Sequence, residues 1–348
     1  MDHICTWICT DAVGEESIYP QTGEKSSGQK HQNIYWRCIL LFFATSKRFN
    51  KTQKHLLFSN TRNIPILDGR NVEESLKSLE VEIIYTDFNY KTPKGYFNLF
   101  QNQFYEFSIL EHIVNNNFNL KDHYLILDSD CIFTQPVDSL FRYAAPRGFA
   151  SFEDDCTTDL VIHGLSRKDM KLLYEDLLDE QIDVIPGYHL GEFFLASVKN
   201  IKIIFEDFKQ LWPQLLRRHE QNLPKFNEEA QTLSFIYFKN KLEASKNKTF
   251  LKRIWTNPVF YRNVEPTDVN VAIWHLPAEK TFGLFDLYTD LIVRLPKFGL
   301  TLPHKIYTKK IQKYLGIPYL SLSGYSKYYC YSYYRALKKR LKSIKTWK

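Results

Sequence analysis

The chain has 348 residues, of which 44% are hydrophobic and 24% charged, as in a globular protein that buries a sizeable core. Its formal net charge is +7, but eight basic residues and no acidic ones fall within residues 325–348. The rest of the chain is nearly neutral, which argues against a nucleic-acid-binding body. The longest apolar run, residues 38–44, is too short to cross a bilayer.

The cysteines and the N-terminus indicate a cellular compartment. The six cysteines are spread along the chain and show neither a CxxC pair nor a zinc-ligand spacing. The first residues include Asp2 and His3 and lack the apolar run of a signal peptide. We therefore expect free thiols and a cytoplasmic protein.

Strand and helix patterns alternate through the first third of the chain. β-Branched apolar runs predict strands, helical periodicity predicts helices, and the polar stretch 11–32 predicts a long mobile loop. In chain order, the predicted elements are strand 3–10, helix 34–49, strand 55–59, helix 72–79, strand 81–85, helix 99–114 and strand 124–127. This order predicts a parallel, doubly wound sheet, with ligands beyond the carboxyl ends of its strands.

The second half of the chain has a mixed pattern. Strands are predicted at 148–152, 191–196, 253–255 and 271–274, and helices at 166–179, 205–219 and 227–238. Asn227 is the expected cap of the last helix, with Glu228 and Glu229 in its first turn. Neither an internal repeat nor a linker is evident, so residues 1–300 are predicted to form one α/β domain and residues 301–348 a helical C-terminal extension.

An apolar strand that ends in Asp128-Ser129-Asp130 is the strongest chemical signal. Residues i and i+2 of an extended chain point the same way, so the carboxylates of Asp128 and Asp130 can hold one divalent cation. Mg²⁺ or Mn²⁺ would keep its remaining positions for phosphate oxygens and water. An ordinary turn after a strand, in which Asp and Ser are common, is the alternative interpretation.

Residues 124–133 (YLILDSDCIF) resemble the DxD segment of GT-A glycosyltransferases. Three later segments follow in the order seen in glycosyltransferase family 8, the galactosyltransferase-like group: 188–194 (YHLGEFF), 228–231 (EEAQ) and 274–280 (WHLPAEK). The resemblance spans roughly residues 4–280. It implies a GT-A fold, which is a Rossmann-like mixed sheet flanked by helices, in an enzyme that transfers a sugar from a nucleotide-sugar donor to a hydroxyl acceptor.

The same resemblance implies a role for each matching residue. Asp130 would be a direct metal ligand, Asp128 a second ligand or a bridge to the donor ribose, and His275 a third ligand, for Mn²⁺ or Mg²⁺. Ser129 lies between the two carboxylates and belongs to the same donor site. Lys280 matches a lysine that would stabilise the charge developing on the departing diphosphate. A half-buried structural histidine and a solvated lysine are the alternatives.

The acid–base residues depend on the stereochemical course. An inverting enzyme needs a carboxylate base near the acceptor hydroxyl, for which Glu192, Glu228 and Glu229 are candidates. A retaining enzyme of the family 8 kind would instead place a glutamine, matched by Gln231, beside the anomeric carbon. Glu228 and Glu229 also suit an ordinary helix N-terminus.

The nucleotide is expected over the end of the first strand. Backbone groups and side chains there could read a uracil edge and bind ribose hydroxyls, and the residues in question are Thr6, Cys9, Thr10 and Asp11. The resemblance favours a UDP-sugar as donor. It also implies polar contacts to the sugar from the helix before the DxD segment, where the amides are Asn98, Gln101, Asn102 and Gln103.

Residues 325–348 combine six tyrosines and one tryptophan with the eight basic residues. Basic and aromatic side chains favour an anionic membrane surface, so we predict peripheral membrane association through this segment. Such a contact suits an acceptor in an envelope polysaccharide or a glycolipid. An ordinary solvated tail and a nucleic-acid patch are the alternatives.

Two other functions remain open. A nucleotidyltransferase that makes the sugar nucleotide has a related sheet and carboxylate site, but it normally carries a compact Gly-rich basic loop after its first strand. Here Gly14, Gly23 and Gly28 are scattered. A non-catalytic carbohydrate- or membrane-binding protein with the same fold is the other interpretation.

Overall fold

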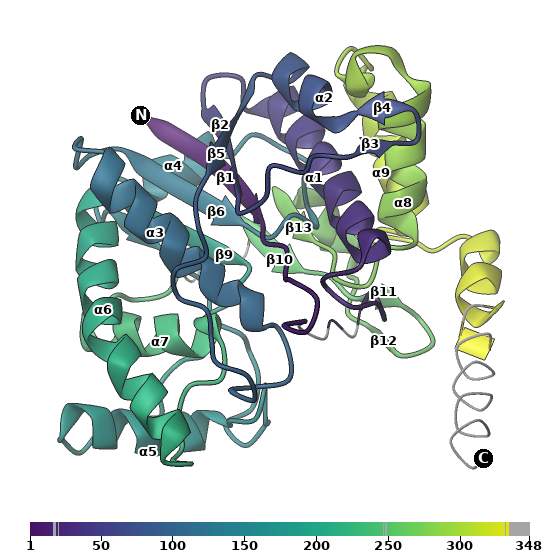
Figure 1. The fold of residues 1–348 in the computed structure, drawn as a ribbon. Coiled ribbons are helices and arrows are strands. Elements are labelled where there is room, and N and C mark those ends of the chain that lie inside the picture. Colours follow the sequence, from purple (N-terminus) through teal and green to yellow (C-terminus); the bar gives the residue numbers. More distant parts are fainter. Residues whose placement is uncertain (17–18, 20, 246, 248, 331, 334–348) are drawn as a thin grey trace.

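The computed structural model describes residues 1–16, 19, 21–245, 247, 249–330 and 332–333. Its centre is a six-stranded sheet with the strand order β5-β2-β1-β6-β9-β8 (Figure 1). These strands are β1 (Asp2–Ile8), β2 (Lys54–Ser59), β5 (Val81–Tyr85), β6 (His123–Leu127), β8 (Phe149–Ala150) and β9 (Phe193–Ser197). The first four in the sheet order are parallel, whereas β9 is antiparallel to both β6 and β8. The sheet is therefore mixed, as expected of the GT-A class.

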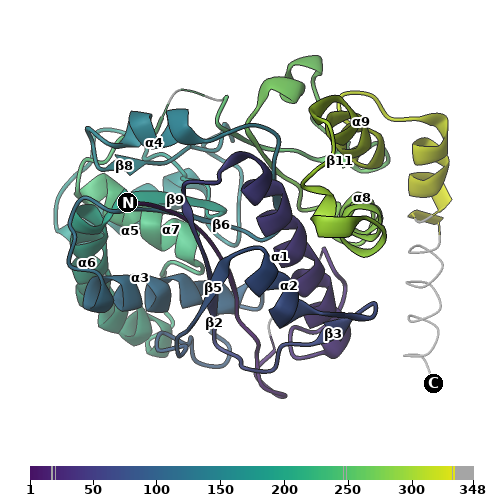
Figure 2. The ribbon, with the colours of Figure 1, turned by 90° about the horizontal axis from the view of Figure 1, so that it is seen from above.

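Helices cover both faces of this sheet (Figure 2). α1 (Gln29–Phe49) and α2 (Val72–Ser78) lie on one face, and α3 (Tyr105–Asn116), α6 (Val198–Glu220) and α7 (Glu229–Lys239) on the other. Successive residues of β1 therefore pack on opposite faces of the sheet. Ile4 packs in the core with α1, and Cys5 packs in the core with α3 and α6. Because both faces are covered, β1 is buried along nearly its whole length.

A second, three-stranded sheet has the order β10-β13-β7, with β10 (Leu251–Arg253), β13 (Ile273–His275) and β7 (Cys131–Phe133). β7 follows the DxD segment directly and pairs antiparallel with β13, so that His275 lies opposite Cys131. This pairing brings two segments more than 140 residues apart in the chain to one point.

Smaller elements complete the fold. They are the strands β3 (Ile66–Leu67), β4 (Arg70–Asn71), β11 (Thr256–Asn257) and β12 (Tyr261–Arg262), the helices α4 (Asp138–Ala144), α5 (Arg167–Leu178), α8 (Gly283–Tyr288) and α9 (His304–Leu315), and the short turns of helix η1 (Gln101–Phe104), η2 (Pro266–Asn270), η3 (Thr289–Arg294) and η4 (Pro296–Gly299).

Several element boundaries differ from those predicted. α6 begins at Val198, seven residues before the predicted start, because Ser197 at the end of β9 caps it by accepting from Asn200 N. α7 begins at Glu229 with Glu228 in the cap position. The predicted cap, Asn227, instead donates its side-chain amide to His163 O at 2.9 Å. β10 and β13 are each displaced by about two residues from the predicted strands.

Two other predicted segments differ in extent from the observed ones. The predicted helix 99–114 is split into η1 and α3, preceded by Phe100 in the left-handed conformation (φ 52°). The predicted loop 11–32 ends where α1 begins at Gln29. Within it, the Ser26 hydroxyl donates to Asp11 Oδ2 at 2.5 Å, which ties the described part of the loop to the end of β1.

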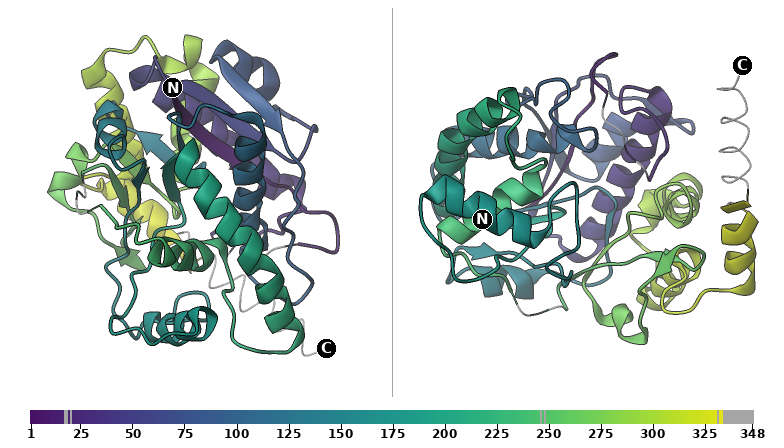
Figure 3. Two further views of the ribbon diagram at one scale, coloured as in Figure 1. Left: turned by 90° about the vertical axis from the view of Figure 1, so that its left-hand side faces the viewer. Right: turned by 90° about the horizontal axis from the view of Figure 1, so that it is seen from below.

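The C-terminal part packs on the α1 side. Tyr307, Ile311 and Leu315 of α9 are buried in the same core as α1. A helix at residues 322–330 follows, and it lies on the opposite side of the molecule from α5 and α6 (Figures 1 and 3). The segment predicted to bind membranes falls largely outside the described residues, since 331 and 334–348 are not among them. Within the described ranges, no helix combines the length and the apolar character needed to span a bilayer.

His55 of β2 makes the stability of this fold depend on pH. Its side chain is fully buried, and its ring nitrogens contact Gln53 O at 3.0 Å and the Ser46 hydroxyl at 2.8 Å. Burial, assisted by the nearby Lys47, lowers the pKa of His55 from 6.5 to about 3. Between these two values the unfolded chain binds a proton that the folded chain does not bind, so stability falls as the pH falls below 6.5.

We expect the wild type to lose about 2 kcal/mol more unfolding free energy than His55→Gln between about pH 7 and pH 4.5. Glutamine retains groups that can hydrogen-bond at this position but does not titrate. Urea unfolding of both proteins at the two pH values measures the difference. Equal losses in the two proteins would show that His55 does not cause the acid sensitivity.

Candidate active site

A cleft of about 1120 Å³ lies at the carboxyl end of β1. Its walls come from Trp7, Ile8 and Cys9, from the start of α7, and from the β10-β13 edge of the second sheet. Asp128, Ser129 and Asp130 form its floor between β6 and β7. The position agrees with the rule that ligands bind beyond the carboxyl ends of parallel strands.

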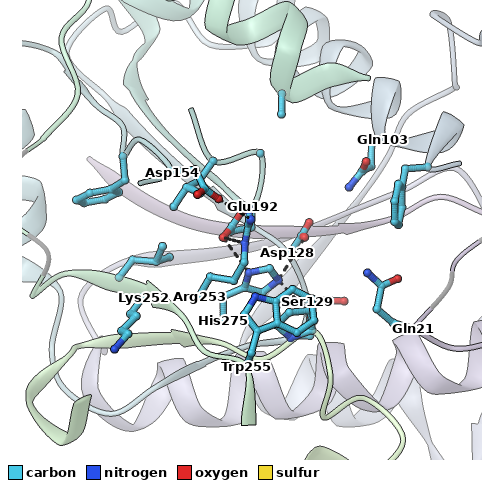
Figure 4. A pocket seen from close by; sticks show the side chains of 18 of the residues that line it. Gln21, Gln103, Asp128, Ser129, Asp154, Glu192, Lys252, Arg253, Trp255 and His275 are labelled. Carbon is cyan, nitrogen blue, oxygen red and sulfur yellow. Dashed lines mark hydrogen bonds and ion pairs between the residues drawn. The ribbon is translucent and has the colours of Figure 1, made fainter. Parts of the chain in front are cut away.

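Asp128, Asp130 and His275 converge in this cleft, and Figure 4 shows Asp128 beside His275. His275 Nε2 lies 3.2 Å from Asp130 Oδ2 and 3.7 Å from Asp128 Oδ2. Each of the three residues offers one ligand atom, and these atoms all lie within 4.8 Å of one another. The pairing of β7 with β13 fixes this arrangement, because it places His275 beside the residue that follows Asp130.

The electrostatics of the three residues depend on their neighbours. Asp130 is 1% exposed and also accepts from Lys280. Burial opposes its ionisation, but Lys280 and His275 outweigh burial and hold the pKa of Asp130 below its usual range. Burial and the adjacent Asp130 raise the pKa of Asp128 to about 6. Asp130 is therefore the permanently ionised centre of the cluster.

Glu192 fixes the orientation of the imidazole. His275 Nδ1 lies 3.0 Å from Glu192 Oε1, on the side of the ring away from Asp128 and Asp130. Arg253 Nε donates to Glu192 Oε1 at 2.8 Å, and Arg253 Nη1 lies 3.1 Å from Asp154 Oδ2. Burial lowers the basicity of His275, but Asp130 and Glu192 outweigh it and raise its pKa to about 9. The chain Arg253–Glu192–His275 thus points Nε2 at the two aspartates.

Two carboxylates and one imidazole form a donor set that suits Mn²⁺ or Mg²⁺. Their convergence at the floor of an open cleft leaves room for further oxygen ligands from a substrate. Metal ligation requires a neutral imidazole, so an ion bound here would displace the proton from His275 Nε2. The residues present therefore fit a divalent cation.

The three candidates near the start of α7, which are Glu228, Glu229 and Gln231, have different surroundings in the structure. Glu229 lines the cleft, is 2% exposed, and has an Oε2 atom with no hydrogen-bond partner among the described residues. Glu228 accepts from Tyr188 and His163. Gln231 is fully buried and outside the cleft wall, where its Nε2 donates to Ile162 O at 3.0 Å. Of these residues, Glu229 is the one that lines the cleft and has a buried oxygen without a hydrogen-bond partner among the described residues.

The approach of Glu229 to the cleft depends on Gly191. A Cβ atom on Gly191 would lie 2.4 Å from Glu229 Oε1, which is closer than real contacts allow. Burial raises the pKa of Glu229 well above its usual value, and the neighbouring Glu228 and Glu106 raise it further.

The residues predicted to bind the nucleotide require correction. Thr6 is fully buried, and its hydroxyl donates to Leu127 O at 2.8 Å. Thr10 N donates to Asn60 Oδ1 at 2.8 Å, and Asp11 accepts from Ser26. Of the residues predicted there, Cys9 lines the cleft together with Trp7 and Ile8, whereas Thr6, Thr10 and Asp11 do not. Thr6 lies within β1 and bonds to the neighbouring strand β6, whereas Thr10 and Asp11 follow the end of β1 and bond to Asn60 and Ser26.

Only two of the four amide side chains predicted to contact the sugar line the cleft. Asn102 and Gln103 line the cleft, whereas Asn98 and Gln101 are not part of its wall. Gln21 reaches the same part of the cleft from the polar loop after β1 (Figure 4). Sequence reasoning missed Gln21, because no local pattern indicates where a loop residue will point.

Three further residues of the site were not predicted: Arg253, Asp154 and Trp255. Of these three, only Arg253 could have been suspected from the sequence, because it is a charged residue in a short strand-like run just before a tryptophan. A charge placed in a buried strand needs a partner, and Glu192 and Asp154 provide it.

Lys280 is held in place by its neighbour Glu279. Glu279 is fully buried and accepts from three elements: the Thr256 hydroxyl of β11, the Tyr328 hydroxyl of the C-terminal helix, and Gly283 N of α8 at 2.7 Å. Because Lys280 contacts Asp130, this network connects the C-terminal helix with the carboxylate cluster.

We expect Tyr328→Phe to lower the free energy of unfolding by about 1–3 kcal/mol, because it removes a donor from a buried carboxyl group. The matched control is Tyr329→Phe on the same helix, where the side chain is 59% exposed. Urea unfolding of the two variants measures the difference. The proposed link would be wrong if both substitutions had the same small effect.

Comparison with known proteins gave the following results. No protein-family model matches the chain, and no curated protein matches it. Among solved structures, an active-site mutant of the galactosyltransferase LgtC shares 13% identity, with 89% of this chain and 100% of that chain covered and a TM-score of 0.50. The chain has the GT-A fold.

Two further solved structures are similar at lower scores. LgtC in complex with donor and acceptor sugar analogs is 12% identical over 86% of this chain and 99% of that chain, with a TM-score of 0.48. Mouse xyloside xylosyltransferase 1, in its apo form, is 12% identical over 79% of this chain and 97% of that chain, with a TM-score of 0.45. The fold assignment rests on the match at a TM-score of 0.50, and at 13% identity the activity has to be argued from the site.

Proposed function

We propose that this chain is a metal-dependent glycosyltransferase, a hexosyltransferase that moves a sugar from a UDP-sugar to a hydroxyl acceptor. The observation that carries the proposal is the convergence of Asp128, Asp130 and His275 on the floor of the cleft, at the carboxyl edge of a GT-A sheet. The solved structure that is similar at a TM-score of 0.50 is a mutant of the galactosyltransferase LgtC, which supports the same interpretation.

The charge of the cleft supports metal dependence. Ten of its lining residues are Asp or Glu, namely Asp128, Asp130, Glu153, Asp154, Asp155, Glu192, Glu228, Glu229, Glu265 and Asp268. The Lys and Arg residues in the wall are Lys252, Arg253 and Lys280, and each of these is already paired with a carboxylate. A nucleoside diphosphate would be repelled by this surface, so its binding requires a cation between the phosphates and the carboxylates.

The residues around the cluster then have defined tasks. Asp128, Asp130 and His275 would hold the cation, which when bound supplies Lewis-acid stabilisation to the leaving diphosphate. Lys280 lies against Asp130 and places an ammonium group where phosphate charge develops. Glu229 lines the cleft and has a buried oxygen without a hydrogen-bond partner among the described residues, so it is the candidate to contact the transferred sugar. Glu192 orients His275, and we do not assign it the role of acid or base.

Calorimetric titration of UDP and of GDP, with and without Mn²⁺, tests the donor and metal assignment. We expect UDP to bind only in the presence of Mn²⁺, and GDP to bind at least about tenfold more weakly. Slow hydrolysis of a UDP-sugar in the absence of acceptor should accompany binding. Absence of any nucleotide binding would refute the proposal, and binding without turnover would favour a non-catalytic binding protein.

A nucleotidyltransferase would behave differently in the same assays. It would bind UTP together with a sugar phosphate and release pyrophosphate, whereas a glycosyltransferase releases UDP from the UDP-sugar. Product analysis by ion-exchange chromatography therefore separates these two functions.

The proposal includes peripheral membrane contact through residues 325–348, on the cytoplasmic side. Lys and Arg near an anionic surface contribute about 1 kcal/mol each, and residues 334–348 contain seven of them. Pelleting with anionic liposomes should be salt-sensitive and should be lost when residues 334–348 are deleted. Unchanged pelleting after the deletion would exclude this segment as the membrane contact.

A further inference from the structure

The cleft extends to both sides of the carboxylate cluster (Figure 4). Gln21 and Gln103 lie on one side, with the end of β1 that is proposed to receive the nucleotide. Asp154, Lys252 and Arg253 lie on the other side. We call this second part the distal arm, and its wall comes from residues 153–155 and from residues 251–268 around β10, β11 and β12.

The distal arm carries an excess of carboxylates. Its acidic residues are Glu153, Asp154, Asp155, Glu265 and Asp268, and its basic residues are Lys252 and Arg253. Lys252 lies 2.9 Å from Glu265 and 2.7 Å from Asp268, so its charge is already compensated. Arg253 is likewise paired with Glu192 and Asp154. An anionic group entering this arm would therefore meet negative charge.

Glu153 is the carboxylate of this arm that is best placed to receive a ligand. Its side chain is 45% exposed, and the His189 ring lies beside it, with Nε2 3.8 Å from Oε1. Burial lowers the pKa of His189 to about 4, so this histidine is neutral at physiological pH and does not compensate Glu153.

Trp255 adds an aromatic surface to the part of the cleft wall that residues 251–268 form. It is partly exposed, lines the cleft and stands at the base of the β11-β12 hairpin. Asn263 closes that base, since its Oδ1 accepts from Trp255 N at 2.8 Å and its Nδ2 donates to Arg253 O at 3.0 Å. The indole is therefore presented to the cleft by a fixed backbone.

Hydrogen bonds from Arg262 also hold the β11-β12 hairpin in place. Arg262 Nη1 donates to Thr256 O at 2.8 Å, and Arg262 Nη2 donates to Gly316 O at 2.7 Å. These bonds tie the hairpin to the segment after α9. A rigid aromatic wall reduces the entropy lost when a ligand stacks on it.

We propose that the distal arm is the acceptor subsite and that it selects a saccharide whose reacting end is neutral or amine-bearing over one that carries a carboxylate or phosphate. The apolar face of a sugar ring stacks on Trp255, and its hydroxyl or ammonium groups donate to Glu153 and Asp154. This inference rests on the proposed function, because it requires the nucleotide to occupy the opposite side of the cluster.

Saturation-transfer NMR tests the inference on the full chain in the presence of UDP and Mn²⁺. The probes are methyl β-galactoside, methyl β-glucoside, glucosamine and glucuronate. We expect the neutral glycosides and glucosamine to bind with millimolar affinity and glucuronate to bind at least about tenfold more weakly. Trp255→Ala should weaken glycoside binding by about tenfold or more, and Trp255→Phe, which keeps a ring, should restore most of it. Glu153→Lys should raise the affinity for glucuronate.

Three outcomes would overturn the inference: glucuronate that binds as tightly as the neutral sugars, no binding by any neutral or amino sugar, or glycoside binding that is unaffected by Trp255→Ala. Titration of UDP with Mn²⁺ into each protein reports the donor side separately. Failure of the proposed function would appear as absent UDP binding in the wild type, whereas failure of the present inference would leave that binding intact.

Discussion

Asp130→Asn is expected to abolish Mn²⁺-dependent UDP binding and to lower sugar transfer by more than about 100-fold, which is the upper end of the effect known for residues that only support a metal ligand. Asp130 Oδ2 is the atom that both His275 Nε2 and Lys280 Nζ contact. Asparagine has the same shape but no charge, so a cation would lose an anionic ligand and keep at most a weaker amide oxygen. The two buried cationic side chains would also lose their common partner.

Calorimetry of UDP with and without Mn²⁺ measures this effect, and circular dichroism establishes that the variant is folded. Asp183→Asn is the matched control, because Asp183 is an exposed residue of the loop before β9. His275→Gln should change metal dependence in the same direction. If Asp130→Asn still bound UDP only in the presence of Mn²⁺, the cation would have to be held elsewhere.

Glu192→Gln is expected to weaken Mn²⁺ binding by about 10- to 100-fold. The carboxylate of Glu192 holds His275 Nδ1 at 3.0 Å and receives the Arg253 guanidinium. Without the negative charge, the imidazole loses the partner that fixes its orientation, and Nε2 becomes a poorer ligand. At saturating Mn²⁺ we expect kcat to recover, because Glu192 does not reach the reacting groups.

This expectation separates a positioning role from the general-base role that the sequence also allowed. A base would lower kcat at every Mn²⁺ concentration and leave the affinity for Mn²⁺ unchanged. Electron paramagnetic resonance of Mn²⁺ gives the affinity, and Glu180→Gln on the exposed surface is the control. Glu192→Ala should in addition lower the free energy of unfolding by about 3 kcal/mol, because it leaves Arg253 without its main partner.

The stereochemical question now centres on Glu229. Sequence reasoning named Glu229, Glu192 and Gln231 together as catalytic candidates. The structure directs Gln231 into backbone contacts and Glu192 onto His275, and leaves a buried oxygen of the cleft-lining Glu229 without a hydrogen-bond partner among the described residues. A catalytic role for Glu229 remains a prediction.

Several features could be predicted from the sequence alone, because they depend on local chemistry. The strands β1, β2, β5 and β6 follow from short apolar, β-branched runs, because both faces of a covered sheet require them. The Asp128-Ser129-Asp130 site follows from the alternation of side chains at the end of an apolar strand. The order of strands and helices predicted the α/β class, and the resemblance to GT-A enzymes predicted the fold that the comparison supports.

Tertiary pairing decided the rest. The antiparallel contact of β7 with β13 brings His275 to Asp130, and the Glu192–Arg253 pair joins residues 61 apart in the chain. No local pattern encodes such contacts, since they depend on which strands pair and in what register. The same limitation explains why Thr6 and Gln231 were expected in the cleft, although the fold turns their side chains into the core. The sequence by itself thus determined the sheet and its carboxylate pair, whereas only the tertiary structure decided which distant side chains complete the site, because long-range packing sets their positions.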